Sequence, residues 1–293
     1  MGERQDPISI AEATKSLVVS KPHVIILGAG ASLAACPNGD RYGRKLPLMS
    51  NFTNVVALDD LVPTESRGQN FEEFFSRIAA DPNESERTRE IEQRVYAYFA
   101  ALELPNEPTI YDHLVLSLRS KDVVATFNWD PFLLQALRRN ESVVKGVEAK
   151  LLFLHGNVLE AFCEHDRVVG VNVARCSKCN QFFEASTLLY PVAKKDYSAT
   201  FSLKANWLEL ETALRNAFMV TIFGYSAPRT DVDAIALLKT AWSGERKRDY
   251  EQIEIIDIRS QSELLENWSE FIYSHHFHVV DDFFKCTSPV EHV

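Results

Sequence analysis

The stretch His23-Val-Ile-Ile-Leu-Gly-Ala-Gly-Ala-Ser32 decides how the rest of this sequence is interpreted. The apolar run Val24–Leu27 is typical of a strand that is buried on both faces of a parallel sheet. The glycines that follow are typical of a strand-to-helix turn whose bare backbone can approach a phosphate group. The phosphate-binding pattern Gly-x-Gly-x-x-Gly fails at its last position, Leu33, so a tight turn that needs glycine for its backbone conformation is the alternative interpretation.

Three later segments repeat this arrangement of a short apolar run followed by small or polar residues. They are Ala125-Thr-Phe-Asn-Trp-Asp130, Leu151-Leu-Phe-Leu-His-Gly-Asn157 and Val220-Thr-Ile-Phe-Gly-Tyr-Ser-Ala-Pro-Arg-Thr-Asp231. Strand-like runs alternate with helical periodicity along the chain, which predicts parallel crossovers and a doubly wound, Rossmann-like α/β fold. Because parallel strands present their carboxyl ends at one edge of a sheet, we expect the polar residues of these segments to converge on one crevice.

The periodicity of apolar residues places the individual elements. Strands are expected over Val24–Leu27, Val123–Thr126, Leu151–Leu154, Phe218–Phe223, Ile253–Ile258 and Phe277–Val280. Helices are expected over Phe71–Ala80, Ser85–Leu102, Thr109–Arg119, Pro131–Arg139, Leu203–Asn216, Asp231–Trp242 and Glu263–Phe271, with a further helix or arm over residues 1–20. We interpret the chain as a single domain over residues 1–293, with a helical insert at residues 38–107 and a small cysteine-containing module at residues 157–203.

Length and composition exclude several classes of protein. With 293 residues, 46% of them hydrophobic, the chain can build a large core and is not of the disordered class. Its net charge of -10 argues against direct nucleic-acid binding, which needs many cationic side chains. No apolar run reaches the roughly 18 residues of a transmembrane helix, and the charged first residues do not resemble a secretory signal. The cysteines show no disulfide framework, so we expect a cytoplasmic protein that binds no membrane.

Candidate catalytic residues stand at the ends of two of these strands. The Asn128 side chain can both donate and accept, so it suits a ribose hydroxyl or a water molecule, and helix capping is an equal alternative. Asp130 is placed to cap the helix that begins at Pro131. His155 precedes Gly156, which leaves the imidazole open on one side, so it is either a structural histidine or a general base with a pKa near neutrality.

Taken together and in this order, the four segments resemble the sirtuin-like fold of NAD-consuming proteins, over about residues 24–257. The resemblance implies that His155-Gly156 is the catalytic His-Gly pair and that Asn128 acts with it. The positions it assigns to NAD binding are Gly28, Ala29, Gly30, Ser32, Asn128, Asp130, Gly224, Tyr225, Ser226 and Asp257. The loop at residues 28–32 meets the pyrophosphate in this scheme, and Asp257 meets the adenosine ribose.

A zinc site is also implied. Cys176-Ser-Lys-Cys179 has the spacing of a zinc knuckle. The family places two Cys-x-x-Cys pairs after its His-Gly, and here Cys163 and His165 stand where the first pair is broken, so the implied ligands are Cys163, His165, Cys176 and Cys179. A decayed site with an ordinary cysteine pair is the alternative. The neighbouring pair Lys194-Lys195 has the composition of a solvated loop.

Departures from the family pattern narrow the implied activity. Residues 36–47 replace the Gly-Ile-Pro-Asp-Phe-Arg segment of the protein deacetylases, and Phe127 replaces the glutamine before the asparagine. These variants resemble the bacterial branch that hydrolyses NAD in anti-phage defence. The resemblance therefore implies an NAD glycohydrolase that acts as a toxic effector in abortive infection, held in check by homo-oligomer contacts or by a partner protein that senses infection. The alternatives are an NAD-dependent deacylase or ADP-ribosyltransferase, and a non-catalytic sensor that binds NAD or ADP-ribose.

Overall fold

The computed structural model describes residues 21–147, 149–192, 195–227, 231–243, 252–268 and 277–286. The helix or arm expected over residues 1–20 lies outside the described residues, and so does Lys194. Within the described part of the chain, no helix is long and apolar enough to cross a membrane.

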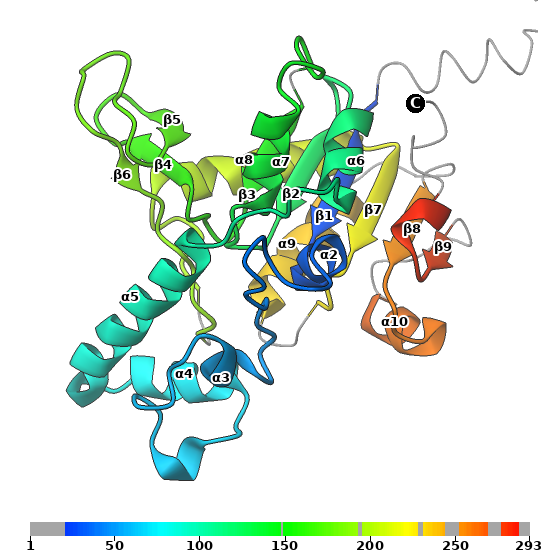
Figure 1. Cartoon of the computed structure of the whole chain (residues 1–293). Helices are drawn as coiled ribbons and strands as arrows, with labels where there is room; N and C mark the ends of the chain where they lie inside the picture. The colour runs from blue at the N-terminus through cyan, green and yellow to red at the C-terminus, as the bar shows by residue number, and fades with distance from the viewer. Residues whose placement is uncertain are drawn as a thin grey trace, which may run out of the picture.

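A six-stranded sheet forms the centre of the structure (Figure 1). Its strands are β1 (His23–Leu27), β2 (Val123–Thr126), β3 (Lys150–Phe153), β7 (Met219–Phe223), β8 (Gln252–Ile256) and β9 (Phe277–Val280). They lie in the order β3-β2-β1-β7-β8-β9, and every neighbouring pair is parallel. This is the strand order of the doubly wound dinucleotide-binding fold, so the predicted α/β fold class is confirmed.

The strand order reverses between β1 and β7, which are hydrogen-bonded neighbours although a long stretch of chain separates them. Leu27 at the end of β1 pairs with Phe223 at the end of β7. Gly28 and Gly224 follow these two residues, so the two predicted glycine loops begin side by side. In open parallel sheets, ligands bind in the crevice outside the carboxyl ends of the strands at such a reversal.

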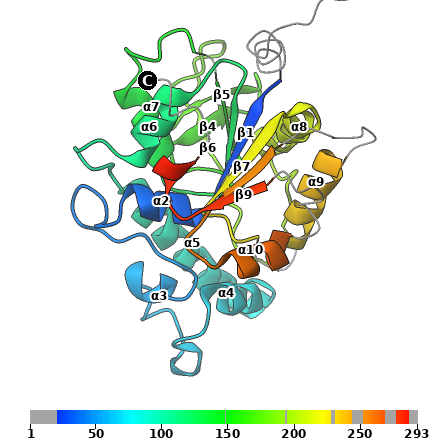
Figure 2. The same cartoon turned by 90° about the vertical axis from the view of Figure 1, so that its right-hand side faces the viewer.

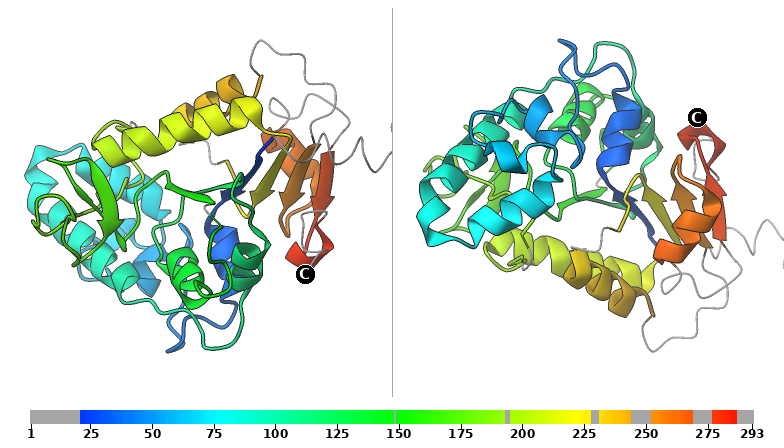
Figure 3. Two further views of the ribbon diagram at one scale, coloured as in Figure 1. Left: turned by 90° about the horizontal axis from the view of Figure 1, so that it is seen from above. Right: turned by 90° about the horizontal axis from the view of Figure 1, so that it is seen from below.

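Helices cover both faces of the sheet (Figure 3). On one side lie α2 (Ala29–Ala35), α6 (Ile110–Ser117) and α7 (Phe132–Arg139), and on the other lie α8 (Phe201–Asn216), α9 (Val232–Ser243) and α10 (Gln261–Trp268). Ile25 and Leu27 belong to the first of the two apolar cores, and Val24 and Ile26 belong to the second. Because both faces of β1 are buried, its sequence is apolar throughout instead of alternating.

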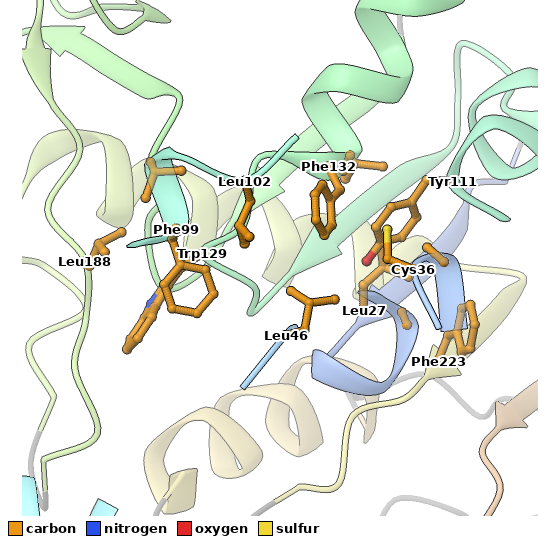
Figure 4. Packing of buried hydrophobic residues seen from close by; sticks show 14 of the residues in the cluster. Leu27, Cys36, Leu46, Phe99, Leu102, Tyr111, Trp129, Phe132, Leu188 and Phe223 are labelled. Carbon is orange, nitrogen blue, oxygen red and sulfur yellow. The ribbon is translucent and has the colours of Figure 1, made fainter. Parts of the chain in front are cut away.

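The three α-helices between α2 and α6 gather beyond the carboxyl ends of the strands (Figures 1 and 2). They are α3 (Phe52–Val55), α4 (Phe71–Ala79) and α5 (Ser85–Ala100). The rings of Phe52 and Phe71 stack with their centroids 4.1 Å apart. The rings of Phe99 of α5 and Trp129 pack edge to face with their centroids 5.5 Å apart, and Figure 4 shows both residues in this packing. These helices therefore form a wall over the crevice and share one apolar core with α2, α6 and α7.

A second, three-stranded sheet lies beside β3 (Figure 1). Its antiparallel strands are β4 (Glu160–Cys163), β5 (Val168–Val171) and β6 (Glu184–Ala185), in the order β5-β4-β6. No strand is predicted here from the sequence, because each of these strands has four residues or fewer and none shows a clear alternation of apolar and polar residues.

Several boundaries differ slightly from the prediction. Helix α7 begins at Phe132, one residue after Pro131, which takes the cap position. Strand β8 ends at Ile256, two residues before the expected end. Helix α10 begins at Gln261, and residues 269–271 of the expected helix lie outside the described residues.

Candidate active site

A cavity of about 440 Å³ opens at the carboxyl ends of β1, β2, β3 and β7, a size within the range of small-molecule sites. Predicted site residues that line it are Gly28, Ala29, Ser32, Asn128, Asp130, His155, Gly224, Tyr225 and Ser226. Residues from the insert close the opposite wall; they include Leu46, Phe52, Glu72 and Phe99. The structure thus brings together side chains from all four motif segments, as the strand-end argument predicted.

The glycines of the two loops allow their backbones to pack against each other. A Cβ atom on Gly30 would lie 2.7 Å from the Cα atom of Gly224, and one on Gly28 would lie 2.5 Å from the Gly224 oxygen. The Gly28 and Gly30 amides donate to the carbonyl oxygens of Phe223 and Gly224, at 2.9 and 3.0 Å. These two amides are therefore engaged within the protein, and the glycines have a packing role in addition to any contact with a ligand.

The Asn128 side chain is held by the loop that follows β1. Its Nδ2 atom donates to the Gly28 oxygen at 2.8 Å and to Ser32 Oγ at 2.9 Å. These bonds orient the amide so that its Oδ1 atom is the side left for a ligand. Ser32 Oγ in turn lies 2.7 Å from the hydroxyl of Tyr111, a residue of α6 that belongs to none of the sequence motifs.

Asp130 belongs to the same buried network. Ser32 Oγ donates to its Oδ2 atom at 2.6 Å, and the Phe132 amide donates to its Oδ1 atom at 3.2 Å. Burial raises the pKa of the Asp130 carboxyl to about 6, although both hydrogen bonds act in the opposite direction. Asp130 therefore accepts from the first amide of α7, although Pro131 holds the cap position, and it also fixes the serine that holds Asn128.

His155 follows β3 and lies in the cavity wall against Phe127, with ring centroids 4.9 Å apart. The ring of Tyr197 lies beyond it at 6.2 Å. Burial lowers the pKa of His155 from 6.5 to about 4, which corrects the expectation of a pKa near neutrality, and the imidazole is neutral at physiological pH. Its Nε2 atom is buried without a hydrogen-bond partner. A buried, unpaired ring nitrogen at a cavity is suited to accept a proton or a hydrogen bond from a ligand.

Lys195 corrects the expectation of a solvated lysine pair, because its side chain is only 4% exposed. It forms an ion pair with Asp231, whose side chain is 6% exposed, and both residues line the cavity. The hydroxyl of Tyr225 donates to Asp231 Oδ2 at 3.0 Å, and its ring stacks on Phe127 at 4.0 Å. The side chain of Tyr225 is therefore committed to packing and to Asp231. The sequence offers one sign of this ion pair, an aspartate in the fourth motif segment, but the lysine partner lies 36 residues away.

Asp257 does not line the cavity. Its two carboxylate oxygens accept from the Nε and Nη2 atoms of Arg259 at 3.0 and 2.7 Å, just beyond β8. Gly30 does not line the cavity either. The predicted ribose contact of Asp257 and the predicted NAD contact of Gly30 therefore stay predictions.

The small module gathers four side chains that could hold a metal ion: Cys163, Asp166, Cys176 and Cys179, with ligand atoms within 4.8 Å of one another. The structure differs from the prediction at one position, because Asp166 takes the place expected for His165. The His165 side chain is 83% exposed, and its Nδ1 atom lies 3.0 Å from Asp166 Oδ1. His165 is thus placed to orient the carboxylate from outside.

The geometry of this cluster fits a tetrahedral ion. Sγ atoms bound to one zinc at about 2.3 Å are about 3.8 Å apart, and Cys163 Sγ lies 3.6 Å from Cys179 Sγ. The backbone amides of Asp166 and Lys178 donate to the sulfur atoms of Cys163 and Cys176, both at 3.4 Å.

Comparisons with known proteins give structural matches only; no family model and no curated protein match the chain. One match is a Sir2 structure with the inhibitor EX-527, 2′-O-acetyl-ADP-ribose and a deacetylated p53 peptide, at 15% identity, covering 96% of this chain and 95% of that chain, with a TM-score of 0.45. Another is a Sir2 structure with a propionylated peptide, at 17% identity, covering 97% and 95%, with a TM-score of 0.41. The identities and TM-scores describe a distant likeness between the fold of this chain and these Sir2 structures.

Proposed function

We propose that this chain is an NAD glycohydrolase that cleaves the bond between nicotinamide and ribose. The observation that carries the proposal is the unpaired Nε2 atom of His155, buried in the wall of a cavity that also holds the tethered amide of Asn128. In the proposed reaction the C1′–N bond breaks and its electron pair goes to the pyridinium nitrogen, so nicotinamide leaves as a neutral molecule. Water attacks C1′ of the ribose and loses a proton to His155.

The charge of the cavity supports binding of the cationic pyridinium end of NAD. Among the described lining residues, the side chains of Glu72, Asp130 and Asp231 carry carboxyl groups, and Lys195 is the one ammonium group. Negative groups near the ring and the ribose stabilise the pyridinium of NAD and the positive charge that develops on the sugar. The aromatic side chains of Phe99 and Trp129 offer apolar surface for a flat ring.

Asn128 and the glycine loops have complementary roles in this proposal. The Oδ1 atom of Asn128 accepts from a ribose hydroxyl or from the attacking water, because its Nδ2 atom is already engaged. Gly28 and Ala29 lie on the cavity wall, where the absence of large side chains leaves room for the pyrophosphate. Ser226, from the loop after β7, lies close enough to the same cavity to contact a phosphate or ribose group.

Two histidine variants test the proposal. His155→Ala should lower NAD hydrolysis by about 10²–10⁴-fold, the usual contribution of a general base. The matched control is His23→Gln, because His23 is also buried and also has its pKa lowered to about 4. His23 is the first residue of β1, so it lies at the end of the strand away from the cavity. The control should keep its turnover. Near-parental hydrolysis by a folded His155→Ala variant would refute the assignment.

We also propose that the cysteine cluster holds zinc as a structural ion, with Cys163, Asp166, Cys176 and Cys179 as ligands. Three thiolates and a carboxylate form a closed set of four, which is typical of a structural site and leaves no position for a substrate. The ion would hold together the small sheet beside the cavity. Its chemistry takes no part in the cleavage of NAD.

The defence role rests on the sequence resemblance alone: we propose depletion of cellular NAD on infection, controlled by a partner protein or by oligomer contacts. In this proposal the loop between α2 and α3 is a gate through which the control acts, because its residues Leu46 and Met49 line the cavity. The test is to express the chain alone and together with the products of neighbouring genes, and to measure cellular NAD with and without phage. Full NAD loss from the chain alone in uninfected cells would rule out partner control.

A further inference from the structure

The proposed function counts Lys195 and Asp231 among the charges of the cavity but gives their buried ion pair no role of its own. Lys195 stands before α8 and Asp231 stands before α9, so the pair joins the two segments that lead into these helices. A buried ion pair gains little stability over apolar residues, because desolvation of both charges offsets their attraction. Its position in the wall of the cavity that contains His155 therefore points to a role at the site.

The surroundings of His155 contain few other charges. Its ring lies against the rings of Phe127 and Tyr197. Among the described residues, the charged groups that act on it are the carboxylate of Asp231, which favours the imidazolium, and the ammonium of Lys195, which disfavours it. The Tyr225 phenol, from the loop after β7, donates to Asp231 Oδ2 at 3.0 Å.

We propose that Asp231 and Lys195 are positioning residues for His155. Asp231 stabilises the imidazolium that forms when His155 takes a proton, and Lys195 orients that carboxylate and keeps the resting imidazole neutral. The identity of the proton donor, an attacking water, rests on the proposed function. The electrostatic coupling between the three side chains does not depend on it.

The coupling has a definite sign. Removing the carboxylate in Asp231→Asn leaves the ammonium alone, so the pKa of His155 should fall. Removing the ammonium in Lys195→Met leaves the carboxylate alone, so the pKa of His155 should rise. We expect the two shifts to be opposite in sign and large enough to resolve in a titration. In the double variant the two shifts should largely cancel.

The test is an NMR pH titration of the full chain with isotope-labelled histidine, in which His155→Gln assigns the resonance. Lys204→Met is the matched control, because it removes an exposed ammonium from the same region at the start of α8. The double variant Lys195→Met/Asp231→Asn leaves no single buried charge, so it guards against a single variant that fails to fold. Opposite shifts in the two single variants, with neither in Lys204→Met, support the proposal. Shifts of the same sign, or no shift in either single variant, overturn it. If only one single variant folds, its His155 pKa is compared with that of the double variant, and a difference of less than about half a unit also overturns the proposal.

This titration separates the proposal from the proposed function, because it needs no turnover. If the shifts appear and the protein does not hydrolyse NAD, the coupling stands and the hydrolase assignment falls. If the protein hydrolyses NAD, the acid limb of the kcat/KM profile should move with the titrated pKa in each variant. Rescue by Lys195→Arg, which keeps the charge, should return both the pKa and the limb toward the parental values.

Discussion

The close approach of the two glycine loops yields a quantitative prediction for Gly224→Ala. Gly224 has a φ of +61°, and a Cβ atom there would lie 2.3 Å from the Ala31 nitrogen and 2.5 Å from the Gly30 Cα atom. These are backbone atoms at the start of α2, so they cannot rotate away as a flexible side chain would. The substitution must either push α2 away from β7 or distort the turn.

The expected loss of stability has two parts. A non-glycine residue with a left-handed backbone costs about 1–2 kcal/mol, and an added methyl group that overpacks a tight contact costs about 1–3 kcal/mol. Gly68→Ala is the matched control, because Gly68 has a φ of +83° but nothing lies within 4 Å of the added Cβ atom. The control should therefore lose the backbone part alone, and Gly224→Ala should lose about 1–3 kcal/mol more than the control.

Urea unfolding of the two variants and the parent measures this difference, provided that the m-values agree. NAD binding to the folded variants adds a second readout, since a displaced α2 also moves Ser32, which holds Asn128. If Gly224→Ala is destabilised no more than Gly68→Ala, the glycines are not required by packing between the loops, and the reasoning about the shape of the crevice is wrong.

Further predictions concern the metal and the buried histidines. Elemental analysis of freshly purified protein should find about one equivalent of zinc. Asp166→Ala should lower the zinc content and its retention under chelator, while His165→Ala should retain the metal. Loss of zinc in His165→Ala but not in Asp166→Ala would favour the ligand set predicted from sequence. His155 and His23 each have a pKa lowered from 6.5 to about 4 by burial. Their neutral forms favour the folded state, so this contribution is fully present above pH 6.5 and is lost as the pH falls to about 4. The loss is about 3 kcal/mol per histidine. Unfolding free energies across this range should fall less steeply in His23→Gln than in the parent, and equal slopes would contradict the burial argument.

The sheet could be predicted because its signal is local. Each strand of a parallel sheet that is covered on both faces needs a continuous apolar run, and the runs at Val24–Leu27 and Val123–Thr126 became strands at those positions. The convergence of Asn128 and His155 followed from the rule that parallel strands present their carboxyl ends at one edge.

Other features depend on contacts between distant residues, which a local pattern does not carry. Lys195 has the composition of a solvated loop, and only its contact with Asp231, 36 residues away, shows that it is buried. Asp166 and His165 are adjacent, and the turn between β4 and β5 directs one toward the cysteines and the other outward. Tyr111 joined the Asn128 network through α6, which no motif linked to the site.

The most direct test of the hydrolase assignment is product analysis after incubation of the purified chain with NAD, alone and with an acetyl-lysine peptide. The account predicts equal amounts of nicotinamide and free ADP-ribose in both reactions, with no change to the peptide, and strong loss of both products in His155→Ala. NAD consumption only in the presence of the peptide would show a deacylase or a transferase. Saturable NAD binding without any product, in a protein with its metal retained, would show a sensor and contradict the central claim.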